Sequence, residues 1–373
     1  VTLAVDPSLV GTYNARYGTE WTMLDSKYYS LLSETVTIPA GKTTSDAVTL
    51  RLRELTGEGD EQTGALPIDE TYLVPVRIGS ASIDVLHGSD VAYYVVITVA
   101  AQLTDNWIEF PTLDKYSESS KDWNGLRAVT YEALIYIDEF VKTNTEGNPV
   151  NISSVMGVEQ YLLLRIGDTN FEREQLHFDG SGSGSGFGKI PGRDAMKHLE
   201  TGRWYHVACT YDQNTRTARI YVDGQIQSEV TGVGITTQND KNCINLAMRA
   251  LYDLWNTAPE GDKAQYEELG YDGLSEAYQF FIGRSYDDYR PLNGKIAEAR
   301  VWSVARTPEQ IWENMYEIEN PENDPTLLGY WKCNDASGNT VKDYSMYGND
   351  GVAKYDIIWP QGIEIPKLNE NNE

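Results

Sequence analysis

Short runs in which apolar side chains occupy every second position constrain this chain more than any other feature. Residues 34–39 and 47–53 follow that pattern, and residues 72–78 and 91–99 add two apolar runs rich in Val, Ile and Tyr. Because successive side chains of a strand point to opposite faces, a period of two indicates β-strands. Polar, turn-forming loops separate the runs. We therefore expect residues 1–103 to form an immunoglobulin-like β-sandwich.

Residues 105–366 are again rich in strand-like runs, but their loops are longer and they hold eight of the nine tryptophans. A single helix is predicted with a clear start signal, over residues 307–315. Thr307 suits an N-cap, Pro308 suits the first helical position, and Gln310 can complete a capping box. The chain as a whole is therefore predicted to be all-β.

The predicted boundary between the two domains lies near residues 103–105, and residues 367–373 are expected to form a disordered tail. The tryptophans in strand-like runs of the second domain are expected in its core. The three cysteines permit one disulfide at most, and we expect them to be small apolar core residues. These core candidates are Trp204, Trp302, Trp331, Cys209, Cys243 and Cys333.

Acidic residues outnumber basic ones strongly, with 56 Asp and Glu against 30 Lys and Arg and a net charge of −26. Such a charge repels phosphate backbones and anionic lipid head groups, so nucleic acid and membrane surfaces are poor partners. The longest mostly apolar stretch, residues 91–103, is shorter than the roughly 20 residues that a bilayer-spanning helix needs.

Catalytic motifs are missing where they would be expected. Glycosidases on sandwich folds can place two acids on one strand with the pattern E-x-D-x-x-E, because period two puts the first two on one face. Three E-x-D pairs occur, but none has the third acid. The four histidines form no H-E-x-x-H motif. Acids from separate strands, such as Glu132, Asp138 and Glu298, nevertheless leave a glycoside hydrolase or lyase open as an alternative.

A calcium ion is the only cofactor that the sequence suggests, because hard cations prefer clustered carboxylate, amide and carbonyl oxygens. The densest group is Asp343 with Asn349 and Asp350. No complete calcium loop of the EF-hand type is present. Solvated turns are the competing interpretation of this group.

Three segments carry a more specific pattern. Residues 202–224 hold two strand-like runs joined by a turn and end in Asp-Gly. Residues 281–309 begin with Phe-Ile-Gly-Arg and run through a strand into the predicted helix. Residues 328–351 begin with Leu-Gly-Tyr-Trp and end in Gly-Asn-Asp-Gly. In this order the segments resemble the bacterial laminin-G-like branch of the concanavalin A-like jelly rolls, and the resemblance spans residues 105–366.

The first domain resembles a domain of unknown function that precedes glycan-processing or glycan-binding modules in Bacteroidetes surface lipoproteins. The resemblance implies a cell-surface, outer-membrane lipoprotein, with neighbouring outer-membrane glycan-uptake proteins as partners. Because the chain starts at Val1 and not at a methionine, we expect its signal peptide and anchor segment to have been removed. For the second domain the resemblance implies recognition of sugars or proteins by the loops of one rim, in some members with calcium.

A long insertion over residues 250–279 departs from the compact laminin-G-like pattern and mixes aromatic with acidic residues. Flat rings can stack on the C–H face of a sugar, while carboxylates, amides and guanidinium groups bind its hydroxyls. The competing interpretation is that these rings only seal the insertion onto the sheet. The predicted glycan-binding residues are Tyr252, Trp255, Arg284, Tyr286, Asp287, Asp288 and Tyr289.

We therefore expect a non-catalytic, cell-surface protein that binds an oligosaccharide or polysaccharide and takes part in carbohydrate capture. The hydrolase or lyase remains one alternative. A protein-binding surface adhesin is the other, and it would present a broad apolar patch in place of a groove lined by aromatic rings.

Overall fold

The fold is known from a computed structural model. It describes residues 1–17, 19–42, 45, 48–52, 71–83, 85, 90–97, 100–113, 121–140, 142–143, 149–159, 161–168, 170–180, 188–234, 243–247, 259–260, 263–264, 279–285 and 290–360. The chain divides into two compact units, one of Val1–Ala100 with Pro360–Glu373 and one of Ala101–Trp359. The predicted tail over residues 367–373 lies outside the described residues.

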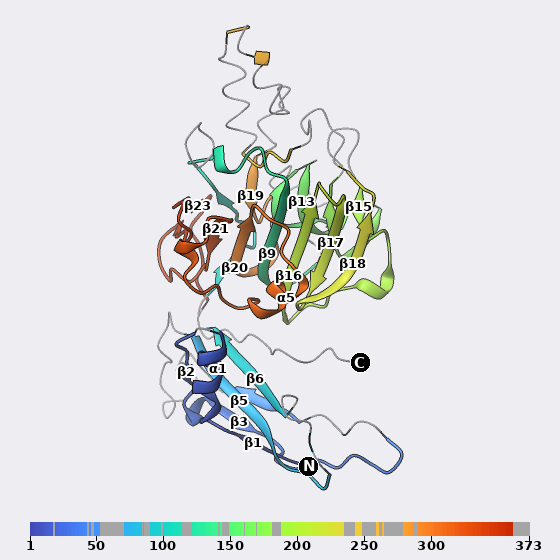
Figure 1. The fold of residues 1–373 in the computed structure, drawn as a ribbon, viewed down its shortest axis with the longest axis vertical. Helices are drawn as coiled ribbons and strands as arrows, with labels where there is room; N and C mark the ends of the chain where they lie inside the picture. The colour runs from blue at the N-terminus through green and yellow to red at the C-terminus, as the bar shows by residue number, and fades with distance from the viewer. Residues whose placement is uncertain are drawn as a thin grey trace. The chain divides into compact units, whose positions relative to one another are not determined.

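The first unit contains a four-stranded and a two-stranded sheet (Figure 1). In the larger sheet β5 pairs with β1, β2 and β6, and its pairing with β2 is parallel. Alternate β5 side chains, Tyr72, Val74 and Val76, pack with Leu24 and Tyr28 in a small core. The elements are β1 (Thr2–Val5), α1 (Leu9–Tyr17), β2 (Thr22–Met23), η1 (Ser26–Tyr28), β3 (Tyr29–Leu31), β4 (Leu50–Leu52), β5 (Thr71–Ser80) and β6 (Val91–Ile97).

Two local predictions for this unit were wrong. The sequence predicts no helix at α1, because this part of the chain is assigned to short strands. Residues 34–39 do not form a full strand: Thr35 makes a single bridge to Thr2, although the alternation of apolar side chains there is regular. The other strand-like runs are confirmed by β4, β5 and β6.

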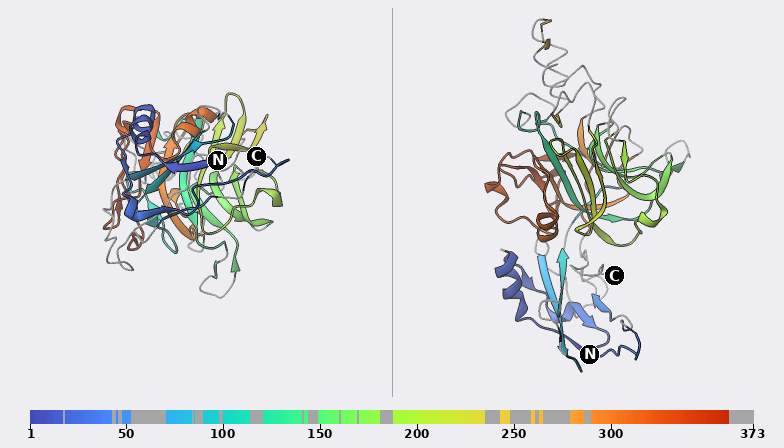
Figure 2. Two further views of the ribbon diagram at one scale, coloured as in Figure 1. Left: turned by 90° about the horizontal axis from the view of Figure 1, so that it is seen from below. Right: turned by 45° about the vertical axis from the view of Figure 1, so that its right-hand side comes forward.

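The second unit is a sandwich of an eight-stranded and a seven-stranded sheet, which the views of Figures 1 and 2 show from three directions. The strand orders are β15-β14-β13-β12-β19-β8-β23-β22 and β18-β17-β16-β9-β20-β21, with β7 paired to β20. Its strands are β7 (Ala101–Gln102), β8 (Ile108–Glu109), β9 (Ala128–Ile137), β10 (Lys142–Thr143), β11 (Pro149–Val150), β12 (Ser153–Val158), β13 (Leu162–Asp168), β14 (Phe171–Asp179), β15 (Lys189–Ile190), β16 (Trp204–Asp212), β17 (Thr217–Val222), β18 (Gln225–Thr231), β19 (Phe280–Ile282), β20 (Gly294–Trp302), β21 (Leu327–Trp331), β22 (Thr340–Val341) and β23 (Gly351–Ala353).

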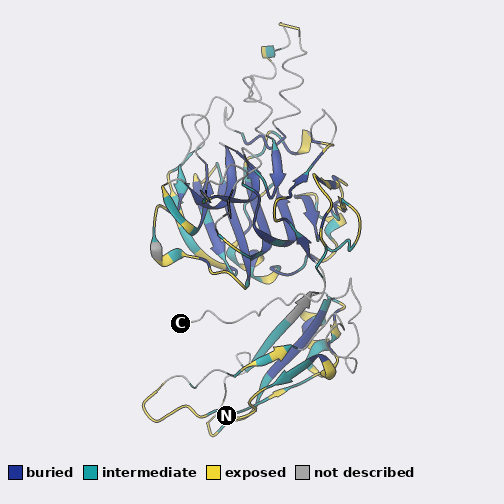
Figure 3. Ribbon diagram, turned by 180° about the vertical axis from the view of Figure 1, so that it is seen from behind, coloured by how far each residue is buried: buried dark blue, intermediate teal, exposed yellow. Residues whose placement is uncertain are grey.

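The core lies between these two sheets and follows the period of two. In β9 the odd positions from Val129 to Ile137 belong to it, and in β13 the even positions Leu162, Leu164 and Ile166 do. Figure 3 shows that most positions of the sandwich strands are buried, whereas many exposed positions lie in connections. All-β architecture is thus confirmed.

Part of each outward face of the sandwich is buried as well. On the seven-stranded sheet, helix α5 (Pro308–Glu313) places its fully buried Ile311 against Ala208 and Tyr221. The predicted capping box is present, because the Thr307 hydroxyl accepts from the Gln310 N–H and the Gln310 amide oxygen accepts from the Thr307 N–H. This unit also contains the 3-10 helices η2 (Ala195–Lys197) and η3 (Pro321–Asn323).

The tryptophans predicted for the core are at most 3% exposed, and Cys209 and Cys333 are likewise buried. Cys243 is half-buried, and all three thiols are free. No helix among the described residues is both long and apolar enough to cross a lipid bilayer.

Candidate functional site

A group of charged and polar side chains lies on the face of the eight-stranded sheet that points away from the core. The strand register places Ser154 of β12, Arg165 of β13 and His177 of β14 side by side in one row. A neighbouring row holds Leu163 and Asp179 next to Lys189 of β15. We call the following set the outer polar cluster: Ser154, Glu159, Arg165, Asp168, His177, Asp179, Lys189 and Arg290.

Arg165 is the centre of the cluster and is only 4% exposed. Its Nη2 lies 2.5 Å from Asp179 Oδ2 and also pairs with Asp168, and its Nη1 lies 3.9 Å from Glu159 Oε1. Lys189 pairs with Asp168 as well. Because a buried guanidinium is costly unless its donors are satisfied, these pairs are what allow Arg165 to sit on the sheet.

His177 is fully buried and neutral in this environment. Burial lowers its pKa, and the positive charge of Arg165 adds to this, so that the pKa falls to about 3 from an ordinary 6.5. Arg165 Nε donates to His177 Nε2 at 3.2 Å. Since Nε2 is the acceptor, the neutral ring carries its proton on Nδ1.

Several buried polar atoms of this region have no hydrogen-bond partner within the described residues. They are Ser154 Oγ, Glu159 Oε2, His177 Nδ1 and, in the connection after β19, Ser285 Oγ. The residues that carry them are at most 7% exposed. Buried polar groups are nearly always hydrogen-bonded in native proteins, so a group of four points to partners beyond these residues. They offer one N–H donor, two hydroxyls and one carboxylate oxygen.

Aromatic rings lie along the neighbouring strands of the same sheet. Phe281 of β19 is paired with Gly157 of β12, and both lie outside the core cluster. The guanidinium carbon of Arg284 lies 4.8 Å from the ring centres of Phe281 and Trp107. Arg290, which follows in the same connection, has Nη1 3.8 Å from Glu159 Oε1.

The structure describes only Arg284 among the predicted glycan-binding residues, and it holds that side chain against two rings. Arg290 brings the same connection, between β19 and β20, to the outer polar cluster, and its carbonyl accepts from the Ser154 N–H at 2.9 Å. The other predicted contacts lie outside the described residues: Tyr252, Trp255, Tyr286, Asp287, Asp288 and Tyr289.

The acids named for a hydrolase alternative occupy other surroundings. Glu132 is fully buried, with Oε1 2.8 Å from Arg306 Nη1 and Oε2 3.6 Å from Arg300 Nη1. Glu298, 6% exposed, pairs with Arg300 at 2.6 Å and accepts from the Tyr330 hydroxyl. These two acids hold the outer side of the seven-stranded sheet together. Asp138 is partly exposed and binds Lys295 at 2.9 Å and the Gln102 amide at 2.8 Å.

The predicted calcium residues do come together, but the Asp343 carboxylate is occupied by protein donors. It accepts from the N–H groups of Tyr330, Ser345 and Asn349 at 2.7–2.9 Å and from the Ser345 hydroxyl at 2.9 Å. Asp350 Oδ1 accepts from the Asp343 N–H at 2.9 Å. The carboxylate thus organises a turn, and calcium binding here stays a prediction.

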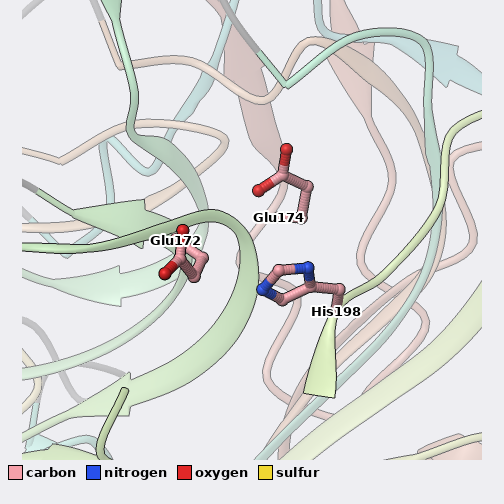
Figure 4. A group of neighbouring side chains, drawn as sticks. All are labelled: Glu172, Glu174 and His198. Atoms are coloured by element: carbon pink, nitrogen blue, oxygen red, sulfur yellow. The ribbon is translucent and has the colours of Figure 1, made fainter. Parts of the chain in front are cut away.

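Another group of metal-ligand types was not predicted (Figure 4). Glu172 and Glu174 of β14 and His198 after η2 have potential ligand atoms that all lie within 4.8 Å of one another. Each carboxylate already has a guanidinium partner, because Arg193 Nε lies 2.7 Å from Glu172 and Arg173 Nε lies 2.7 Å from Glu174. These positive charges oppose a cation, and the group carries no metal assignment.

The sequence contains one signal for the outer polar cluster. Residues 162–168 read Leu-Leu-Leu-Arg-Ile-Gly-Asp, and His177 stands between Leu176 and Phe178. When apolar residues precede and follow a charged residue in a strand, the strand is expected to be buried on both faces. Which strands bring Arg165 to His177 and Ser154 depends on the register, which the sequence pattern leaves open.

Comparisons with known proteins agree with this architecture. Residues 104–259 match the family model of the concanavalin A-like lectin/glucanases superfamily, of laminin-G type. Residues 1–85 match the model of a separate N-terminal domain family. A search of curated proteins found no match.

Among solved structures, the chain is similar to a protein of Bacteroides ovatus ATCC 8483 that is provisionally described as a carbohydrate binding protein. The identity is 28%, the TM-score 0.49, and the match covers 99% of this chain and 89% of that one. A heptameric SAP-like pentraxin from Limulus polyphemus is 13% identical at a TM-score of 0.30, over 56% of this chain and 80% of that one.

Domain 4 of AbnA, a GH43 extracellular arabinanase from Geobacillus stearothermophilus, was solved with arabinotriose. It is 14% identical at a TM-score of 0.29, over 65% of this chain and 86% of that chain. Two parts of the chain thus match two different family models: residues 1–85 match an N-terminal domain family, and residues 104–259 match the concanavalin A-like lectin/glucanases superfamily.

Proposed function

We propose that this protein binds neutral glycans over the outer polar cluster of the eight-stranded sheet and does not cleave them. The observation that carries the proposal is the connected set of charged side chains on this face, of which Lys189 and Arg290 are 27% and 23% exposed. A sugar presents several hydroxyl groups, each of which can donate and accept. Such a ligand matches a surface that offers ammonium and guanidinium donors beside carboxylates.

The charges of the cluster favour a neutral ligand. Three cationic side chains face three carboxylates in a connected set of ion pairs. A net charge near zero gives no preference for an anionic or cationic sugar, and the pairs fix the hydrogen-bonding groups in place before binding. The six charged residues are Arg165, Lys189, Arg290, Glu159, Asp168 and Asp179.

Aromatic rings are the second element of the proposal, because a flat ring beside polar groups suits the two-sided chemistry of a sugar. Trp107 and Phe281 are at most 3% exposed and pack against Arg284, so they support this region and do not face a ligand. Tyr252 and Trp255 of the insertion, with residues 286–289, are proposed as further contacts. This part rests on sequence alone.

Binding without cleavage is supported by the state of the carboxylates. A glycosidase needs one protonated carboxyl group as the general acid and a second carboxylate across the scissile bond. In the outer polar cluster, each of the three carboxylates already lies in an ion pair with Arg or Lys. Glu132 and Glu298 are enclosed beneath helix α5 and the segment that follows it.

The test uses a glycan array followed by titration calorimetry of the glycans that bind. Arg290→Ala, which removes a partner of Glu159, and Trp255→Ala are each expected to weaken binding about tenfold, as the loss of roughly 1.4 kcal/mol predicts. Arg193→Ala is the matched control, because this arginine is 65% exposed and pairs with Glu172 outside the cluster.

Folded protein that binds no glycan, or full affinity in both Arg290→Ala and Trp255→Ala, would contradict the proposal. Reducing ends released from a bound polysaccharide would favour the hydrolase, and binding to surface proteins without sugar competition would favour the adhesin. Location at the cell surface, a lipid anchor and neighbouring glycan-uptake proteins stay predictions from the resemblance.

A further inference from the structure

A pocket of about 470 Å³ opens on the other sheet of the sandwich, between helix α5 and the turn from β17 to β18. Its volume lies in the range of about 300–1,000 Å³ that is typical of small-molecule sites. Every lining residue is described by the structure, and none belongs to the outer polar cluster. The lining combines Trp312, Pro308 and Ile226 with the polar side chains of Gln225, Glu309 and Glu313.

The indole ring of Trp312 packs closely against Gly224 in the turn between β17 and β18. Gly224 in the turn has φ +72°, and a Cβ at that position would lie 2.6 Å from Trp312 Cε3 and 2.7 Å from Met315 Sδ. A residue with a side chain would therefore displace the indole. On the same helix Ile311 is fully buried, so the half-exposed Trp312 ring presents one side to the pocket on a rigid support.

The polar side chains of the pocket are available for a ligand. Gln225, Glu309 and Glu313 are exposed, and none of their side chains makes a hydrogen bond or an ion pair with the described part of the chain. The two glutamates stand four residues apart on α5, and hence on the same side of the helix. No Lys or Arg lines the pocket, so its local charge is negative.

These features define the chemistry of the occupant. An indole beside Pro and Ile suits an apolar C–H face, while two carboxylates and an amide suit vicinal hydroxyls or an amino group. A ligand that carries its own carboxylate or sulfate would be repelled by Glu309 and Glu313. A sugar unit that is neutral or bears a free amine meets all these conditions.

We propose that this pocket is a second carbohydrate subsite, specific for a neutral or amino sugar unit, on the sheet opposite to the outer polar cluster. The class of ligand rests on the proposed function, whereas the location and the charge preference rest on the pocket alone. Two subsites on one domain would raise the affinity for a polysaccharide above that for a short oligosaccharide through multivalency, provided that one chain can reach both.

The test follows the indole N–H signal of Trp312 in the two-dimensional NMR spectrum of the whole, 15N-labelled protein, assigned by its loss in Trp312→Phe. Glucose, glucosamine and glucuronic acid are titrated separately. We expect glucose or glucosamine to shift the signal saturably and glucuronic acid to bind at least about fivefold more weakly. The double variant Glu309→Gln, Glu313→Gln should lose this discrimination.

Controls separate this inference from the proposed function. Trp359→Ala removes another half-exposed tryptophan and should leave the Trp312 titration unchanged. Arg290→Ala weakens the outer polar cluster and should also leave it unchanged. A Trp312 signal that no sugar shifts overturns the inference even if the glycan array is positive. A saturable shift together with unaltered array binding in Arg290→Ala instead contradicts the proposed function at its own site.

Discussion

The buried carboxylate of Glu132 permits a quantitative prediction about what holds the second unit together. It lies on the outer face of the seven-stranded sheet, fully buried, between Arg306 at 2.8 Å and Arg300 at 3.6 Å, with His206 Nε2 at 3.3 Å. Replacing it in Glu132→Gln keeps the shape of the side chain but removes the charge that balances two guanidinium groups.

The magnitude follows from the pKa of this group. Burial alone would raise the pKa of Glu132, but Arg306, His206 and Arg300 outweigh it and lower the pKa to about 2 from an ordinary 4.5. That difference corresponds to about 3 kcal/mol of stability at neutral pH. Breaking a buried ion pair by removing one partner costs roughly 3–5 kcal/mol, which agrees. For a unit of this size, 3 kcal/mol lowers Tm by about 6–12 °C.

Thermal unfolding followed by tryptophan fluorescence is a suitable assay, because eight of the nine tryptophans lie in the second unit. The exposed Glu309→Gln is the matched control and should change stability by less than about 0.5 kcal/mol. Because the pKa of Glu132 is depressed on folding, its stabilisation is complete above pH 4.5 and declines as the pH falls towards 2. A loss below about 1 kcal/mol in Glu132→Gln at pH 7 would refute this account of the network.

Three further predictions concern the neighbouring parts of the second unit. The pKa of His177 is lowered to about 3 in the folded protein. The free energy of unfolding should therefore fall by about 1.4 kcal/mol per pH unit as the pH drops from 6.5 towards 3. In a series of urea titrations, His177→Gln should lack this slope. Thr307→Ala removes the capping box of α5 and should cost about 0.5–2 kcal/mol in the same titration, while Thr307→Ser should not. Asp343→Ala leaves three N–H groups without their acceptor and should cost at least about 2 kcal/mol in chelator. A larger Tm loss in calcium is what the predicted calcium site requires, whereas equal losses in calcium and in chelator would contradict that site.

The sequence predicts correctly those features that depend on neighbouring residues in the chain. The α5 helix begins at its capping box because the Thr307 and Gln310 side chains satisfy backbone groups within one turn. Tryptophans in strand-like runs are buried because their size makes exposure costly. The predicted strand at residues 34–39 was wrong because a strand needs a partner strand, which is not set by neighbouring residues in the chain. Thr35 makes only one bridge, to Thr2.

The candidate site was harder to predict because it depends on contacts between distant strands. Ser154, Arg165 and His177 meet only because β12, β13 and β14 pair in a particular register. A shift by one residue would turn Arg165 towards the core. Similarly, nothing local to Glu132 indicates that Arg306, 174 positions away, supplies its counter-charge. The sequence could predict the presence of charged residues on doubly buried strands but not their partners.

The central claim is that the second unit holds a neutral glycan at the outer polar cluster and releases it intact. Titration calorimetry of a glycan found on the array, with wild type and Arg290→Ala measured side by side and the ligand recovered for mass spectrometry, tests it most directly. The account predicts binding that is about tenfold weaker in Arg290→Ala and a recovered ligand of unchanged mass. Equal affinities, or a ligand recovered as shorter fragments, would contradict it.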